Sequence, residues 1–174
     1  MVKINKNIKA FTLIELLMVA AVMGLLLLAV GSIFQVVSQS WVTQDVRTGL
    51  DINLYKGMEI ASIDLRDTSA VQSSNDEIRF TDDGVNYYIY YLYNSADSYP
   101  PNFSKSSYQL RKATLTGGIS GTFTYGSGQI IISNVLPPPV SDLSFTGNVI
   151  NLDISVKQNY ETIRAKTEVH PRNV

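Results

Sequence analysis

An apolar stretch near the start of the chain limits what the whole sequence can fold into. It runs for 20 residues, from Phe11 to Val30, and only Thr12, Glu15 and Gly24 interrupt it. As a helix it is about 30 Å long, which matches the hydrocarbon thickness of a bilayer. Three lysines precede it, namely Lys3, Lys6 and Lys9. The pattern predicts a single N-terminal membrane helix with the lysines on the cytoplasmic side.

Glu15 is the only charged residue inside this stretch. A carboxylate near the bilayer centre costs roughly 2.5–3.5 kcal/mol, but Glu15 lies only about 6 Å along the helix from Phe11. One interpretation is that the side chain reaches the headgroups. The other is that its charge gains a partner on assembly, such as the free amine of Phe11 in a neighbouring subunit, because intramembrane charges are normally paired or functional.

Residues 10–15 (AFTLIE), behind their basic leader, resemble the class III leader of type IV pilins and type II secretion pseudopilins. The resemblance implies that a prepilin peptidase cuts between Ala10 and Phe11 and that the new amine of Phe11 is methylated. It also implies that Glu15 acts in assembly by pairing with a neighbour's N-terminus. The family usually has Gly before the cut, where this chain has Ala10. We expect slower or unchanged processing from that difference.

An ordinary secretory signal is the alternative interpretation of the N-terminal stretch. Residues 28–32 (LAVGS) resemble a signal-peptidase site. The apolar region of such signals is typically 7–15 residues long, which is shorter than this one. A membrane helix is therefore favoured.

Composition argues against several classes of function. The formal charge is −1, and removing the three leader lysines leaves 11 basic and 15 acidic residues, a net charge of −4. Without a basic patch, no nucleic-acid partner is predicted. The absence of cysteine excludes disulfides and thiolate metal sites.

No catalytic centre or cofactor site is predicted either. His170 is the only histidine, so a histidine metal site or a Ser–His triad is not expected. Neither a phosphate-binding lysine loop nor a dinucleotide fingerprint occurs. Asp76, Asp82 and Asp83 offer oxygen ligands for calcium, but they lack the spacing of a calcium loop. We expect no enzyme, no cofactor and no bound metal.

The fold expected is α+β and pilin-like, with one long helix from Thr12 to about Asp67 packed on an antiparallel β-sheet. Beyond Val30, apolar residues recur every three or four positions, which predicts an amphipathic continuation of the helix. The residues in this stripe are Trp41 or Val42, Val46, Leu50, Leu54, Met58, Ala61 and Leu65.

The rest of the chain alternates as strands, after a loop over residues 69–75. The expected strands cover residues 77–81, 85–93, 108–114, 121–125, 129–133, 141–145, 149–156 and 162–169. Tyrosines crowd the second of these strands on both faces. One face is expected to pack on the helix, and the other is either a partner surface or a sheet face that favours aromatic residues.

Four parts of the chain follow from these patterns. They are a leader peptide (1–10), a membrane or filament-core half of the helix (11–37), an amphipathic half (38–67) and a β-rich domain (68–174). Short segments of the domain resemble J-type minor pseudopilins and the related W-type minor pilins. These segments are residues 63–67 (IDLRD), 78–80 (IRF), 108–111 (YQLR) and 167–173 (TEVHPRN).

The resemblance implies a minor structural subunit of a type II secretion pseudopilus or type IV pilus, at or near the filament tip. The implied partners are a prepilin peptidase, other minor and major pilins or pseudopilins, the inner-membrane assembly platform and, before assembly, membrane lipid. The implied location is the inner membrane, crossed once, with the N-terminus cytoplasmic and the domain periplasmic or extracellular, and then the filament. The alternative is a membrane-anchored periplasmic binding domain that never polymerises.

Overall fold

The computed structural model describes residues 12–74 and 76–172. The chain divides into two compact units, Met1–Gln44 and Asp45–Val174. One helix, α1 (Leu13–Arg66), contributes to both units. The predicted helix from Thr12 to about Asp67 is therefore confirmed.

In the second unit, α1 buries one face against the sheet. The buried positions are Leu50, Leu54, Gly57, Met58, Ala61 and Leu65, which repeat at helical spacing and bear out the predicted stripe. Trp41 and Val42 do not belong to this buried face. They lie in the first unit, where their side chains are exposed. The prediction was wrong for these two residues because the apolar period starts earlier in α1 than the part of the helix that packs on the sheet.

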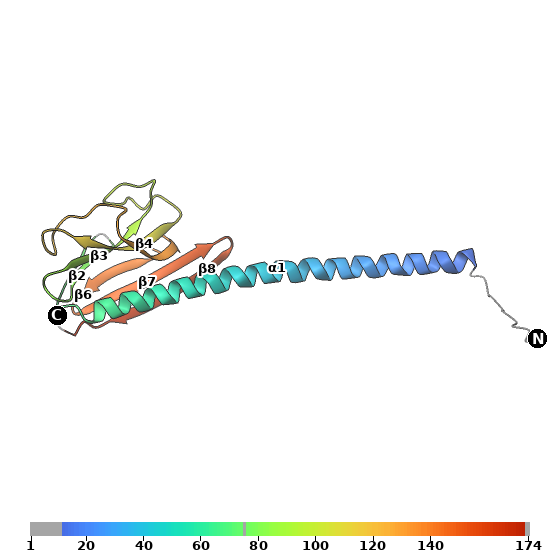
Figure 1. The fold of residues 1–174 in the computed structure, drawn as a ribbon, viewed down its shortest axis with the longest axis horizontal. Coiled ribbons are helices and arrows are strands. Elements are labelled where there is room, and N and C mark those ends of the chain that lie inside the picture. The colour runs from blue at the N-terminus through green and yellow to red at the C-terminus, as the bar shows by residue number, and fades with distance from the viewer. Residues whose placement is uncertain (1–11, 75, 173–174) are drawn as a thin grey trace, which may run out of the picture. The chain divides into compact units, whose positions relative to one another are not determined.

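The domain contains eight antiparallel strands in one sheet (Figure 1). They are β1 (Ala70–Ser74), β2 (Glu77–Thr81), β3 (Tyr87–Tyr93), β4 (Tyr108–Leu115), β5 (Gln129–Val135), β6 (Asp142–Thr146), β7 (Val149–Gln158) and β8 (Glu161–Val169). The order across the sheet is β1-β2-β3-β4-β5-β7-β6, and β8 pairs with the other edge of β7. The predicted α+β architecture, a long helix on an antiparallel sheet, is confirmed.

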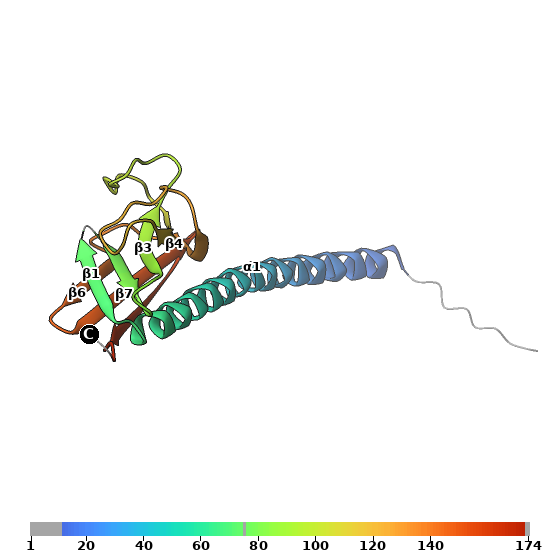
Figure 2. The same cartoon turned by 60° about the vertical axis from the view of Figure 1, so that its left-hand side comes forward.

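The sheet curls so that β6 approaches β1 and β2 (Figure 2). The backbone N–H of Phe145 in β6 donates to Ser73 Oγ in β1 at 3.0 Å. The inner face of this curled sheet and the buried face of α1 enclose the main core.

Two strand predictions were wrong. Residues 70–74 form β1 rather than a loop, because pairing with β2 from Ala70↔Thr81 to Ser74↔Glu77 outweighs the polar local composition. Residues 121–125 form a loop with a single isolated bridge, Thr116↔Thr122. There the aromatic side chains of Phe123 and Tyr125 pack onto β3 instead of extending a ladder.

The tyrosines of β3 pack on both faces of the sheet. Tyr88 and Tyr90 face the main core with α1. Tyr91 lies on the outer face and is 2% exposed, because Phe123 and Tyr125 cover it with ring centroids 4.7 and 5.7 Å away. The outer face of β3 is thus covered by the chain's own loop, and the interpretation as a partner surface is wrong at Tyr91.

Candidate functional site

The first turn of α1 is closed by Thr12 and Glu15. Glu15 Oε2 accepts hydrogen bonds from the backbone N–H and the hydroxyl of Thr12, both at 2.9 Å. In return, the backbone N–H of Glu15 donates to Thr12 Oγ1 at 3.4 Å. This is the reciprocal pattern of a capping box, which satisfies backbone donors that a helix start otherwise leaves unpaired.

The capping role of Thr12 was not predicted. The signal for it is the Thr-x-x-Glu spacing directly before an apolar run. The cap gives Glu15 a polar partner within its own chain. Neither of the two interpretations drawn from the sequence includes this partner. Both hydrogen bonds that the Glu15 carboxylate accepts among the described residues end on the same oxygen, Oε2.

After this cap, α1 exposes nearly all of its apolar side chains in the first unit. Among the described residues, α1 is the one helix long and apolar enough to cross a membrane, and none of its most apolar window is buried. Burying a Val, Leu, Ile, Phe or Met side chain is worth about 1.5–3 kcal/mol each. A segment with so many exposed apolar side chains in succession fits a single-pass membrane anchor bearing a globular domain.

Ser32 within this segment is satisfied by its own helix. Ser32 Oγ donates to the carbonyl oxygens of Leu28 at 2.9 Å and Ala29 at 3.0 Å. Such bonds back to the preceding turn are how serine is accommodated in an apolar helix. Gly24 and Gly31 have nothing within 4 Å of where a Cβ would lie, so each leaves open space on the helix surface.

The predicted cleavage and methylation site, Ala10 and Phe11, lies outside the described residues, as do the three leader lysines. The described residues that adjoin it are Thr12 and the first turn of α1. The structure places Glu15 in the first turn of α1, and in the sequence it is the fifth residue after the predicted cut.

Asp76, Asp82 and Asp83, whose oxygens were weighed as calcium ligands, are not gathered into a metal site in the described part of the chain. Among residues 12–74 and 76–172, no group of three His, Cys, Asp or Glu side chains is arranged to hold a metal ion. Asp83 instead closes the β2–β3 turn, where its Oδ1 accepts from the backbone N–H groups of Asn86 at 2.7 Å and Val85 at 2.8 Å. These bonds lower the pKa of Asp83 to about 2.

Two of the segments that resemble minor subunits meet in space. The backbone N–H of Arg172 donates to the carbonyl oxygen of Arg66 at 2.9 Å, and its guanidinium lies 3.5 Å from Asp67. The C-terminal segment thus caps the last turn of α1, whose carbonyl groups otherwise lack partners.

Comparison with known proteins agrees with this arrangement at the N-terminus. The family described as the prokaryotic N-terminal methylation motif matches residues 5–31. No curated protein and no solved structure gave a significant match. The motif is the prepilin leader. The match covers the leader and the first part of α1, and it agrees with the resemblance to type IV pilin leaders drawn from residues 10–15.

Proposed function

We propose that this chain is a minor pilin or pseudopilin, a structural subunit at or near the tip of a type II secretion pseudopilus or type IV pilus. The observation that carries the proposal is that the methylation motif covers residues 5–31, and so includes the start of an exposed apolar helix. Cleavage between Ala10 and Phe11, followed by methylation of the Phe11 amine, produces the mature chain.

The four parts of the chain then have separate roles. Residues 1–10 are the leader, and residues 11–37 hold the subunit in the inner membrane, with the N-terminus cytoplasmic. Residues 38–67 and 68–174 form the amphipathic helix half and the periplasmic or extracellular domain. On extraction by the assembly platform, contacts with neighbouring helices replace lipid around the apolar half.

Glu15 drives docking of the subunit into the filament. Its carboxylate is costly in an apolar environment, and the Thr12 cap satisfies only part of its hydrogen-bonding capacity, since a carboxylate accepts about four bonds. A positively charged, methylated amine of Phe11 on a neighbouring subunit supplies the opposite charge. The pair stabilises the docked state because two compensated charges are less costly in an apolar environment than one isolated charge.

The assignment to a minor subunit of the J or W type is supported by residues 63–67 and 167–173, which resemble those subunits and contact each other through Arg172. The chain also lacks the paired C-terminal cysteines of many major pilins. Both features favour a minor subunit over a major one.

Filament incorporation tests the proposal. The wild-type chain and Glu15→Ala are produced in their native host, and sheared filaments are probed for each. We expect Glu15→Ala to reduce incorporation at least tenfold while leaving the amount in the membrane unchanged. Equal amounts of both proteins in the membrane, with neither in filaments, would instead support the alternative, a membrane-anchored binding domain that never polymerises.

A further inference from the structure

Strand β8 forms an open edge of the sheet. Among the described strands it pairs with β7 alone, and this pairing is uninterrupted over all nine residues of β8. The sheet is closed on another side, where β6 approaches β1 and the N–H of Phe145 donates to Ser73 Oγ. The outer side of β8 is therefore a place where the domain can accept a further strand.

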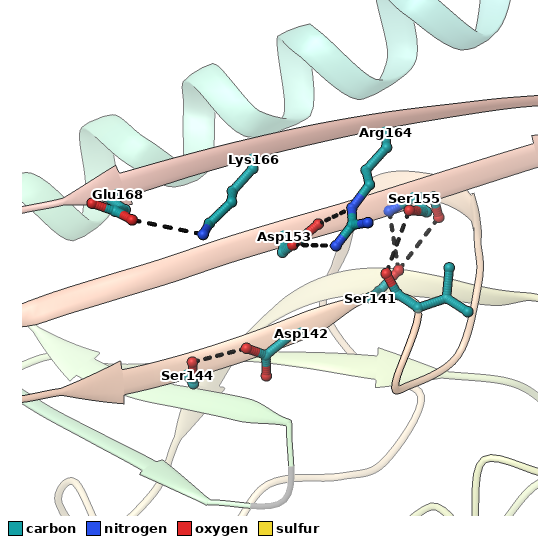
Figure 3. A network of polar contacts seen from close by, with 9 residues as sticks. Ser141, Asp142, Ser144, Asp153, Ser155, Arg164, Lys166 and Glu168 are labelled. Atoms are coloured by element: carbon teal, nitrogen blue, oxygen red, sulfur yellow. Dashed lines mark hydrogen bonds and ion pairs between the residues drawn. The ribbon is translucent and has the colours of Figure 1, made fainter.

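The backbone of Ser155 on β7 shows which groups of β8 point outward. Its carbonyl oxygen accepts from the N–H of Leu136 at 2.8 Å, and its own N–H donates to Ser141 Oγ at 3.0 Å (Figure 3). Both groups of Ser155 thus point away from β8. Opposite residues of an antiparallel pair either exchange both hydrogen bonds or neither. Arg164, the register partner of Ser155, therefore directs its N–H and C=O groups away from β7.

The same orientation recurs at every second residue of β8. The residues whose backbone groups point outward are Thr162, Arg164, Lys166 and Glu168. Among the described residues, no backbone hydrogen bond outside the strand ladders reaches these groups. A row of exposed N–H and C=O groups of this kind is a template for pairing with another chain.

Side-chain burial shows that the main core ends at β8. Ile154 and Val156 on β7 are fully buried, whereas their register partners Ala165 and Ile163 on β8 are only partly buried. These two side chains pack on the rim of the core. An added strand with apolar side chains on this face would extend the core beyond β8.

The usual obstacles to edge pairing are weak at β8. Natural sheets often protect an edge with proline, a bulge or a projecting charge. β8 contains neither proline nor glycine, and its register does not shift. The guanidinium of Arg164 bonds the Asp153 carboxylate on β7 at 2.7 and 2.6 Å, and so turns away from the open edge (Figure 3). Lys166 lies 3.7 Å from Glu168 on its own strand.

The charges of β8 disfavour pairing with a second copy of itself. The two-fold antiparallel registers that overlap most of β8 are centred on Arg164, Ala165 or Lys166. In each of them a cation lies opposite a cation, which destabilises a strand pair. A strand from a different chain, with carboxylates opposite Arg164 and Lys166, would instead gain opposite-charge pairs.

We propose that the outer edge of β8 binds an extended segment of a different chain, in which apolar and acidic residues alternate, as a further strand of the sheet. The four outward-facing residues of β8 pair with its backbone. Its carboxylates lie opposite Arg164 and Lys166, and its apolar side chains lie beside Ile163 and Ala165. The proposal goes beyond the filament role given above and does not depend on it.

Residue-resolved amide exchange of the full-length chain in non-ionic detergent tests this edge. The probes are two end-blocked peptides of the length of β8, one alternating valine with glutamate and the other alternating valine with lysine. We expect the glutamate peptide in excess to slow exchange at Thr162, Arg164, Lys166 and Glu168 by roughly tenfold or more. The amides of β8 that face β7 should exchange slowly with or without peptide. The lysine peptide should bind roughly fivefold more weakly or worse.

Two substitutions separate backbone pairing from charge. Lys166→Pro removes one outward N–H, a position where an edge strand tolerates proline, and should abolish the slowing at Arg164 and Glu168. Slow exchange of the amides that face β7 verifies that this variant is folded. Lys166→Gln keeps the N–H and should keep the slowing, with a smaller preference for the glutamate peptide.

Three results would overturn the proposal. One is that the glutamate peptide leaves the four outward amides of the wild-type chain unprotected. Another is equal protection by the two peptides, which would remove the preference for an acidic partner. The third is protection that a folded Lys166→Pro chain retains in full. The measurement on the wild-type chain is decisive even if Lys166→Pro does not fold.

Discussion

The carboxamide of Asn53 on α1 binds both backbone groups of Ser133 on β5. Asn53 Nδ2 donates to the Ser133 carbonyl oxygen at 3.1 Å, and the Ser133 N–H donates to Asn53 Oδ1 at 3.5 Å. Among the described strands, neither β4 nor β7 gives Ser133 a register partner. A helix side chain thus takes the place of a neighbouring strand where the sheet opens between β5 and β7.

Asn53→Ala is expected to destabilise the domain by about 1–3 kcal/mol, because two half-buried backbone groups lose their partners. The loss should appear even though Ala has the better helix propensity. Ile52→Ala, at an exposed neighbouring position of α1, is the matched control and should stay within about 0.5 kcal/mol of wild type. Denaturant unfolding of the full chain in detergent measures both.

Gly57 marks the closest approach of α1 to β5. A Cβ there would lie 2.2 Å from Ile132 Cγ1 and 2.9 Å from the carbonyl oxygen of Ile131. We expect Gly57→Ala to lower the free energy of unfolding by about 1–3 kcal/mol through overpacking. Gly49, on the same helix, has nothing within 4 Å, so Gly49→Ala should instead stabilise by up to about 1 kcal/mol. The same sign for both variants would contradict the close approach.

Alkaline pH should destabilise the domain through its buried tyrosines. Burial raises the pKa of Tyr108 to about 12. Burial and its 2.5 Å hydrogen bond to Asp64 also raise the pKa of Tyr90. Above pH 10 the unfolded chain releases these protons while the folded chain retains them, so stability is present below pH 10 and is lost as pH rises from about 10 to 12.

Denaturation midpoints between pH 8 and 12 measure this effect. Tyr108→Phe should flatten part of the alkaline decline, because it removes one of the tyrosines whose pKa burial raises. Tyr160→Phe, at a fully exposed position, should leave the curve as it is in wild type. A midpoint that does not change up to pH 12 would show that neither buried hydroxyl is linked to folding.

A pair of substitutions distinguishes the role of Glu15 in capping from its proposed role in assembly. Thr12→Ala removes the cap, at a cost of about 1 kcal/mol to the helix start, but keeps the carboxylate. Glu15→Gln keeps the capping box but removes the charge. We expect filament incorporation to be retained in Thr12→Ala and lost in Glu15→Gln, as measured in sheared filaments. The reverse order would mean that Glu15 acts through the helix cap alone.

The helix and several strands could be predicted from the sequence where the hydrophobic periodicity is strong. The buried stripe from Leu50 to Leu65 repeats at helical spacing, and β7 and β8 alternate as strands. The strand β1 was missed because its residues are polar and its stability comes from pairing with β2. The prediction of a strand at residues 121–125 was wrong because aromatic residues such as Phe123 and Tyr125 are common in both strands and packed loops.

Other features depend on contacts that local sequence does not encode. Asn53 and Ser133 are 80 residues apart, and nothing near either one signals the other. The Thr12–Glu15 cap has a local signal, the Thr-x-x-Glu spacing, whereas a partner for the Glu15 charge in another chain has none.

The most direct test of the proposed function is the N-terminus of the mature protein. Intact mass and N-terminal peptide sequencing of the protein from its native membrane should show a chain that begins at a methylated Phe11. That result would establish processing as a pilin or pseudopilin. A chain that still begins at Met1, or that is cut near Gly31, would contradict it and leave an anchored or secreted binding domain.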